Sequence, residues 1–465
     1  MISPNWRGTA ILLGALFVAA LTIGGSDSAA MAGKVAWIAG VGLGSAFAWE
    51  AMRRPPREWF RIDWAALATA YYLTLAEFLF PQPQFSGEVD PDSAASALRL
   101  VLAGLAALAI GRHLAWPARA DRPWPNPSRR EWLALLIGCF ALGHLHMFLS
   151  VGFNPVTLIR EMLGPRFSQP WARERLGDSR ALLSELQLLN YLIPPLTAWL
   201  IVQTWRRPWQ RLVIALPLVF LLFASFCGGT RYVLATHVAT FAVALAWTLP
   251  ELPWRRALLL FGIPLAAVLF ITVVALQFRH QGLSQKLQNS KPAHAPPRRF
   301  IVDNNLRTIA RLTETFPAKH GFLGTEVPLH ILVRPLPRAF FPAKPEKLSL
   351  SMEEIAGIPQ TSIASTFVGE GFIMAGWRGS VAFGLILGAL CACWNRIPVL
   401  AGSASAIILY ASGFHWALLT ARSPIWLSIG FLPCLAFVLV LRVAFPVARS
   451  LLPAQGATDH GPPRL

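Results

Sequence analysis

The sequence is poor in charged residues, which make up 14% of its 465 positions, against about 25% in an average soluble domain. Hydrophobic residues make up 55%. They fall in runs of about 20 residues, the length that crosses the apolar core of a bilayer. A soluble protein of this composition would leave apolar faces uncovered. Although length alone suggests about three globular domains, composition excludes a disordered chain, a secreted disulfide scaffold and a soluble enzyme.

Cysteine is also scarce, with five residues that all lie in or at the edge of apolar runs. No cysteine lies in a connection predicted to be external, so no disulfide framework is expected. Cys391 and Cys393 are two apart and point to different faces of a helix, which argues against a metal pair. No cofactor and no metal is predicted.

The apolar runs predict an all-α polytopic membrane protein with about twelve transmembrane helices. Their boundaries are accurate to a few residues. The predicted spans are 8–25, 33–50, 64–80, 97–116, 131–151, 186–204, 211–228, 232–249, 257–277, 379–394, 398–418 and 424–444.

Acidic residues are few: 23 stand against 41 Lys and Arg, for a net charge of +18. In a soluble chain this excess would suggest nucleic acid, but in a membrane protein it must first be divided between the two sides. With the N-terminus inside, the cytoplasmic segments hold 19 basic residues and the short external connections four. This asymmetry predicts that both termini are cytoplasmic. The alternative, that the first span is a signal peptide cleaved near Ser28-Ala29-Ala30, leaves the other spans in the same orientation.

The predicted organisation has four parts. They are a nine-helix region 1–277 that includes an external loop 152–185, a large external loop 278–378, a three-helix region 379–444 and a cytoplasmic tail 445–465.

The two long external loops contain 18 of the 22 external basic residues, including Arg166 and Arg173 in the first loop. Because Arg offers a planar fork of donors that keeps its charge, the set favours an anionic, phosphate-bearing substrate. The alternative for any single Arg is a lipid headgroup or a local acidic partner.

Within the second loop, Leu306, Ile309, Ala310, Thr313 and Phe316 recur at helical spacing and predict an amphipathic helix along the external membrane surface. Its Arg307 and Arg311 either face a substrate or are solvated.

The stretch Arg334 to Pro345 has four prolines, which exclude a regular helix and hold an extended backbone that presents Arg334, Arg338 and Lys344. The alternative is a structural turn in the lipid. Further on, Glu370 lies in an apolar, Gly-rich stretch at the membrane edge, where an ionisable residue is costly and often functional. The alternative is a structural pair with one Arg.

Histidines within predicted spans are expected to be hydrogen-bonded packing residues. His415, with Arg422 nearby, is the strongest exception, and Glu77 near the outer end of the third span is a minor candidate.

The order of these parts resembles the bacterial oligosaccharide repeat-unit polymerases, the O-antigen (Wzy-type) polymerases. The resemblance is sharpest from about 225 to 385. It depends on Gly229-Thr230-Arg231, Gly324-Thr325, Leu336-Pro337-Arg338 through Pro342-Ala343-Lys344-Pro345, and Gly369-Glu370 with Gly376 and Gly379.

The resemblance implies a glycosyltransferase of GT-C-like architecture in the bacterial inner membrane. It would extend a glycan on undecaprenyl diphosphate at the external face, without a metal. The implied partners are that lipid-linked oligosaccharide, membrane lipids, and a chain-length regulator and flippase of the same pathway; no nucleic acid is expected. Arg338 and Glu370 would be catalytic. The predicted diphosphate-binding or substrate-binding residues are Arg231, Arg334, Lys344, Arg166, Arg173 and His415.

Three other readings remain. An O-antigen ligase shares the lipid-diphosphate donor, but its family relies on a His where this chain has Glu370. A transporter or flippase predicts repeated halves with broken helices, whereas the sequence shows no repeat and its charges gather in loops. The third is a structural membrane anchor.

Overall fold

The structure, a computed structural model, describes residues 4–115, 124–172, 183–204, 207–278, 282–288, 300, 302–336, 341, 345, 348–349, 365–397 and 403–451, and these residues form helices without strands. The α-helices up to residue 227 are α1 (Trp6–Leu21), α2 (Ser28–Ala51), α3 (Ile62–Thr74), α4 (Pro83–Glu88), α5 (Pro91–Gly111), α6 (Arg129–Gly143), α7 (Leu145–Ser150), α8 (Pro155–Leu163), α10 (Ile193–Gln203) and α11 (Pro208–Cys227). The later ones are α12 (Arg231–Thr248), α13 (Trp254–Phe278), α14 (Leu283–Gln288), α15 (Asn305–Thr315), α16 (Glu326–Val333), α18 (Thr366–Trp394), α20 (Ala404–Arg422), α21 (Leu427–Leu439) and α22 (Phe445–Leu451).

Shorter helical turns connect these helices. They are the 3₁₀ turns η1 (Pro56–Trp59), η2 (Ala76–Leu79), η3 (Arg166–Ser168), η5 (Leu186–Leu192) and η6 (Pro424–Trp426), and a π-helical turn η7 (Val440–Ala444).

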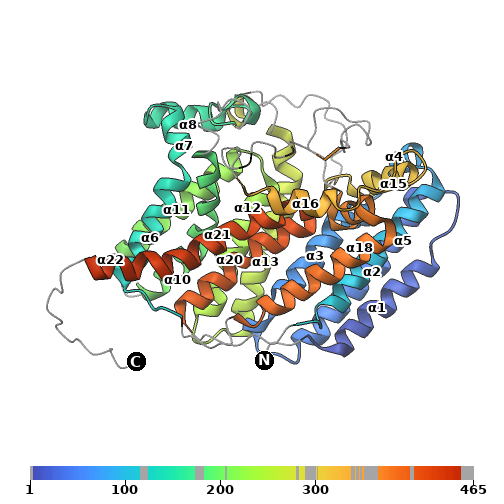
Figure 1. Cartoon of the computed structure of the whole chain (residues 1–465), viewed down its shortest axis with the longest axis horizontal. Coiled ribbons are helices and arrows are strands. Elements are labelled where there is room, and N and C mark those ends of the chain that lie inside the picture. Colours follow the sequence, from blue (N-terminus) through green and yellow to red (C-terminus); the bar gives the residue numbers. More distant parts are fainter. Residues whose placement is uncertain are drawn as a thin grey trace.

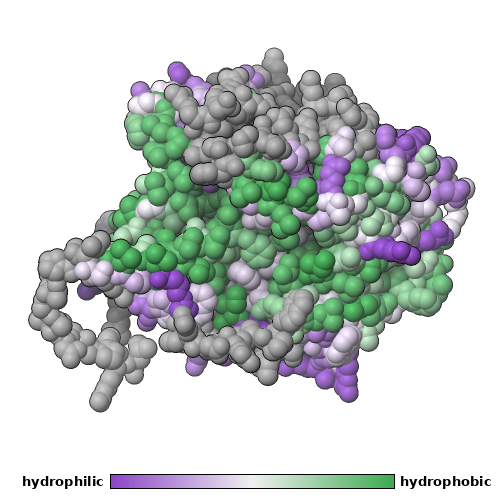
Figure 2. Space-filling model, viewed as in Figure 1, coloured by the Kyte–Doolittle hydropathy of each residue, from purple (hydrophilic) through white to green (hydrophobic). Residues whose placement is uncertain are grey.

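The protein is a helical membrane protein by the length and apolar character of its helices. Six candidate spans are found in the described part of the chain: Ser28–Ala51, Pro91–Gly111, Pro208–Cys227, Thr366–Trp394, Ala404–Arg422 and Pro424–Val447. Hydrophobic residues cover a broad band of the visible face, and hydrophilic ones gather at its upper right and lower edges (Figure 2). Of the other predicted spans, some fall on shorter helices, such as the 13-residue α3 and 11-residue α10, and one falls on the 25-residue α13. Twelve spans therefore remain a prediction.

One side of the bundle depends on close backbone packing between α5 and α18, which run side by side (Figure 1). A Cβ atom on Gly111 would lie 2.4 Å from the carbonyl oxygen of Leu385, and one on Gly388 would lie 2.5 Å from that of Leu108. In a membrane, helices associate through such small residues because lipid provides no hydrophobic drive between them.

Helix α18 is broken and folds back on itself. Ala375 and Gly376 have non-helical dihedral angles, with φ +64° at Gly376, a conformation that glycine adopts at little cost. The Ser380 hydroxyl donates to the carbonyl of Val368 at 2.7 Å, although residues twelve apart in a straight helix are separated by roughly 18 Å. The predicted span 379–394 is therefore the second half of a helical hairpin whose first half, 366–374, the sequence did not reveal.

Four buried charged residues connect helix ends that are predicted, from the asymmetry of basic residues, to be cytoplasmic. Arg61 pairs with Glu50 at 2.9 Å and with Asp63 at 2.6 Å, and Arg112 pairs with the same two carboxylates at 2.5 and 3.0 Å. All four side chains are 1–2% exposed. Asn395, which follows α18, donates to Asp63 at 2.7 Å. The two cations and two anions balance, as buried charges must.

The opposite helix ends also meet one another. The Ser28 hydroxyl at the start of α2 donates to the carbonyl of Val89 at 2.8 Å, and Arg307 of α15 pairs with Glu88 at 3.0 Å. Ends predicted to share a side of the membrane thus lie together. Which side is cytoplasmic remains a prediction.

The predicted amphipathic helix is present as α15, and its apolar face is buried. Leu306, Ile309 and Ala310 are 0% exposed, in a helix that packs against α5 and α18. Its position along the external membrane surface remains a prediction. Arg307 pairs with Glu88, and Arg311 pairs with Glu314 at 3.0 Å. Both arginines therefore have a local acidic partner, which was one alternative to a substrate for any single external Arg.

Candidate functional site

A cluster of arginines and carboxylates lies at the helix ends predicted to be external. Arg231 begins α12 after a turn at Gly229, which has φ +61°, and Arg422 ends α20, which packs against α12. Asp303 lies between them, 3.2 Å from Nε of Arg422 and 3.6 Å from an Nη of Arg231. The three side chains are 18–28% exposed, so a ligand from outside could reach them.

The loop before α15 carries Asp303 and is attached to the end of α3. The Glu77 carboxylate accepts a hydrogen bond from the backbone N–H of Val302 at 3.1 Å. The Asn305 side chain donates to the carbonyl of Leu73 at 2.9 Å. Glu77 was a minor candidate from sequence, and its contacts give it a role in holding this loop.

Glu370 lies in the first half of the α18 hairpin and is 3% exposed. Its carboxylate accepts hydrogen bonds from the Ser423 hydroxyl and, at 2.9 Å, from the Ile425 N–H. The cations whose fields act on it are Arg334 and Arg422. Glu370 thus links the hairpin to the connection between α20 and α21.

Arg334 caps the C-terminus of α16 beside the same connection. Its guanidinium carbon lies 3.5 Å from the ring centroid of Trp426 in η6, and one Nη is 3.2 Å from Nε2 of His330. A guanidinium stacked on an aromatic face is held in one orientation while its edge can still donate hydrogen bonds.

Three residues predicted from sequence therefore come to one region: Arg231, Arg334 and Glu370. Counting Arg422 and Asp303, the described residues give this region three guanidinium groups and two carboxyl groups. Fixed, cationic hydrogen-bond donors at a helix end are suited to bind a phosphate or diphosphate and to stabilise charge that develops on it.

Other predicted site residues lie outside this region or outside the described residues. Arg338, Lys344 and Arg173 belong to segments that the structure does not describe. Arg166 is in η3, with its guanidinium 5.6 Å from the ring centroid of Phe167. No described contact joins it to the cluster.

His415 is buried inside the bundle rather than beside the arginines. Its ring stacks on Tyr191 with 3.4 Å between centroids, and Tyr191 lies 4.8 Å from the ring of His237. His415 precedes Arg422 by seven residues of α20, roughly 10 Å along the helix axis. These contacts favour a packing role, but neither ring nitrogen of His415 has a hydrogen-bond partner among the described residues, so the expected hydrogen bond is absent there.

The sequence did contain a signal for Arg422. Arg231 and Arg422 are two of only four basic residues in the short external connections, where positive charge is usually avoided. Asp303 and His330 gave no such signal, since neither stands out from its neighbours.

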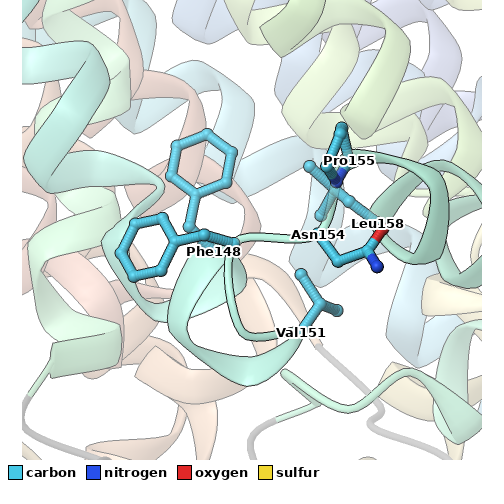
Figure 3. A pocket seen from close by; sticks show the side chains of 6 residues that line it. Phe148, Val151, Asn154, Pro155 and Leu158 are labelled. Carbon is cyan, nitrogen blue, oxygen red and sulfur yellow. The ribbon is translucent and has the colours of Figure 1, made fainter.

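A separate apolar pocket of about 330 Å³ lies between the end of α7 and the start of α8 (Figure 3). It is lined by Phe148, Val151, Phe153, Asn154, Pro155 and Leu158. None of these residues is ionisable, so the pocket lacks the chemistry of the arginine cluster.

The described residues contain no group of three His, Cys, Asp or Glu that could hold a metal. No protein-family model, curated protein or solved structure matches the chain. The arginine–carboxylate cluster is therefore the observation from which a function must be inferred.

Proposed function

We propose that the protein is a membrane glycosyltransferase that polymerises oligosaccharide repeat units carried on undecaprenyl diphosphate. The reaction would take place on the external face of a bacterial inner membrane, with both termini in the cytoplasm and about twelve spans in a GT-C-like arrangement. The resemblance in sequence suggests this activity. The observation that supports it most is the meeting of Arg231, Arg334 and Arg422 with Glu370 at one end of the bundle.

The chemistry requires a cationic site for the leaving group. As the glycosidic bond to the lipid diphosphate breaks, the departing oxygen keeps the electron pair and negative charge develops on the diphosphate. Arginines beside it would stabilise that charge, and each charge-assisted hydrogen bond contributes roughly 1.5–3 kcal/mol. Arg231, Arg334 and Arg422 would supply these donors, with Arg338 and Lys344 from the adjacent proline-rich stretch.

The acceptor hydroxyl must also lose a proton as the new glycosidic bond forms, and arginine cannot accept it. Glu370 is one candidate base. Its two contacts leave it two roles: it takes this proton after a local opening of the hairpin, or it anchors residues 423–425 and so positions the arginines. The two roles predict different effects of mutation.

An O-antigen ligase is the second candidate because of His330. Ligases resemble polymerases in their donor and rely on a His before the late spans. The structure has His330 in contact with Arg334 at 3.2 Å. A neutral imidazole beside a diphosphate-binding arginine could serve as the base for either reaction.

Deletion of the gene followed by a gel of surface polysaccharide distinguishes these functions. A product limited to single repeat units supports the polymerase. Loss of attached glycan with lipid-linked polymer accumulating supports the ligase, and repeat units retained inside the cell indicate a flippase. Complementation with wild type should restore long chains, whereas Arg338→Ala and Arg334→Ala should not. Arg307→Gln, which changes an external arginine paired with Glu88, is the matched control and should restore them.

A further inference from the structure

Asp303 occupies the space between two arginines as an internal anion. Its single carboxylate faces two guanidinium groups. The contact with Arg422 is 3.2 Å and that with Arg231 is 3.6 Å, the latter too long for a hydrogen bond. Ion pairs between partly exposed side chains contribute at most about 1 kcal/mol, so Asp303 can be displaced at low cost.

Helix geometry adds to the positive potential around Arg231. The N-terminus of an α-helix carries a partial positive charge that favours anions, and Arg231 is the first residue of the 18-residue α12. Arg422 is in the last turn of α20, where the helix favours a cation. A phosphate, with more charge and more acceptor oxygens than a carboxylate, fits the two guanidinium groups and the N-terminus of α12 better than Asp303 does.

Asp303 reaches the arginines on a loop that has its own anchor. Glu77 accepts from the backbone N–H of Val302 and also hydrogen-bonds the backbone of Asp303 and Asn304. The Gln82 amide donates to the carbonyl of Phe300 at 2.9 Å. These anchors belong to η2 and the turn after it, whereas the arginines belong to α12 and α20. The loop that carries Asp303 is therefore held independently of the two arginines.

We propose that Arg231 and Arg422 form a phosphate-binding site in which Asp303 is a built-in competitor. Asp303 holds the two guanidinium groups in place when the site is empty, and the phosphate group of the substrate displaces it. Glu77 is a positioning residue that delivers Asp303 to the site. The identity of the phosphate carrier as a lipid-linked glycan depends on the proposed function, but the competition between Asp303 and phosphate does not.

Binding to the purified full-length protein tests this site directly. Inorganic diphosphate and farnesyl diphosphate would be titrated by calorimetry into wild type and variants in detergent. Asp303→Asn should bind both probes up to about fivefold more tightly, because removing a pair worth about 1 kcal/mol changes affinity by that factor. Arg422→Ala and Arg231→Ala should bind at least about tenfold more weakly, since each loses a charge-assisted hydrogen bond.

Matched controls come from the second external pair, Arg307 with Glu88, which has similar exposure. Arg307→Gln and Glu88→Gln should leave the affinity unchanged, which excludes a general effect of external charge. If Asp303→Asn does not fold, Gln82→Ala is the substitute variant. It removes the hydrogen bond from the Gln82 amide, which is more exposed than Glu77, to the Phe300 carbonyl. The same loop is loosened, so binding should also become tighter.

Equal or weaker binding by Asp303→Asn, or by Gln82→Ala where only that variant folds, overturns the competitor role. Absence of binding by wild type overturns the site itself. Preference for farnesyl diphosphate identifies a lipid-linked ligand, and equal affinity identifies the phosphate group alone as what is recognised. Because no step needs glycosyl transfer, these outcomes are separate from the polysaccharide gel that tests the proposed function.

Discussion

Replacing Glu370 by glutamine or alanine separates the two roles that its contacts allow. The carboxylate is 3% exposed and accepts from the Ser423 hydroxyl and the Ile425 N–H. In Glu370→Gln, the amide oxygen can accept from Ile425 while the amide nitrogen donates to the Ser423 oxygen. Both contacts survive, and only the ability to accept a proton is lost. In Glu370→Ala, both donors lose their partner.

The two variants should therefore differ in stability. A buried donor left without a partner costs about 1–3 kcal/mol, so Glu370→Ala should lose roughly 2–6 kcal/mol of unfolding free energy, and Glu370→Gln little. If Glu370 is the base, Glu370→Gln should be folded but lower the rate by about 10²–10⁴-fold. The gel should then show single repeat units without long chains.

The assay combines the polysaccharide gel with thermal unfolding of the purified protein in detergent. A ladder of normal length from stably expressed Glu370→Gln would refute a role as base. If Glu370→Ala then loses both the ladder and its thermal stability, Glu370 is an anchor for the segment that follows α20. If Glu370→Ala is as stable as wild type, the two hydrogen bonds are not holding this segment.

Three further substitutions test the packing and charge of the bundle. Gly379→Ala should lower the melting temperature, because its Cβ would lie 2.0 Å from the carbonyl oxygen of Gly371, whereas Gly44→Ala, with nothing within 4 Å, should not; equal melting would contradict the hairpin. Arg112→Ala should abolish monodisperse protein in size-exclusion chromatography, since a buried pair that loses one partner costs about 3–5 kcal/mol; wild-type yield would argue against the buried charge cluster. Arg334→Ala should eliminate long chains on the gel, and Arg334→Lys should restore them only in part because lysine keeps the charge without the planar stack; full activity of the alanine variant would exclude Arg334 from the site.

Local patterns were sufficient for some elements. The apolar face of α15 was predicted from helical spacing, because which residues share a helix face depends only on their separation in sequence. The break in α18 was not predicted, although Gly376 was noted. A glycine can end, kink or simply pack a helix, and here the choice depended on the approach of Gly371 to Gly379.

The sequence by itself determined that this protein is helical and embedded in a membrane. Apolar runs of this length favour lipid over water, and within lipid the backbone N–H and C=O groups must find hydrogen-bond partners inside the segment, as they do in a helix. It also determined that certain helix ends share a side, and the structure groups those ends. Only the tertiary structure decided which charges meet. Arg231, Asp303 and Arg422 are far apart in the chain, and their contact depends on how α12 and α20 pack and on the loop that Glu77 holds. These arginines, which are predicted to be external, become a candidate site only through that packing.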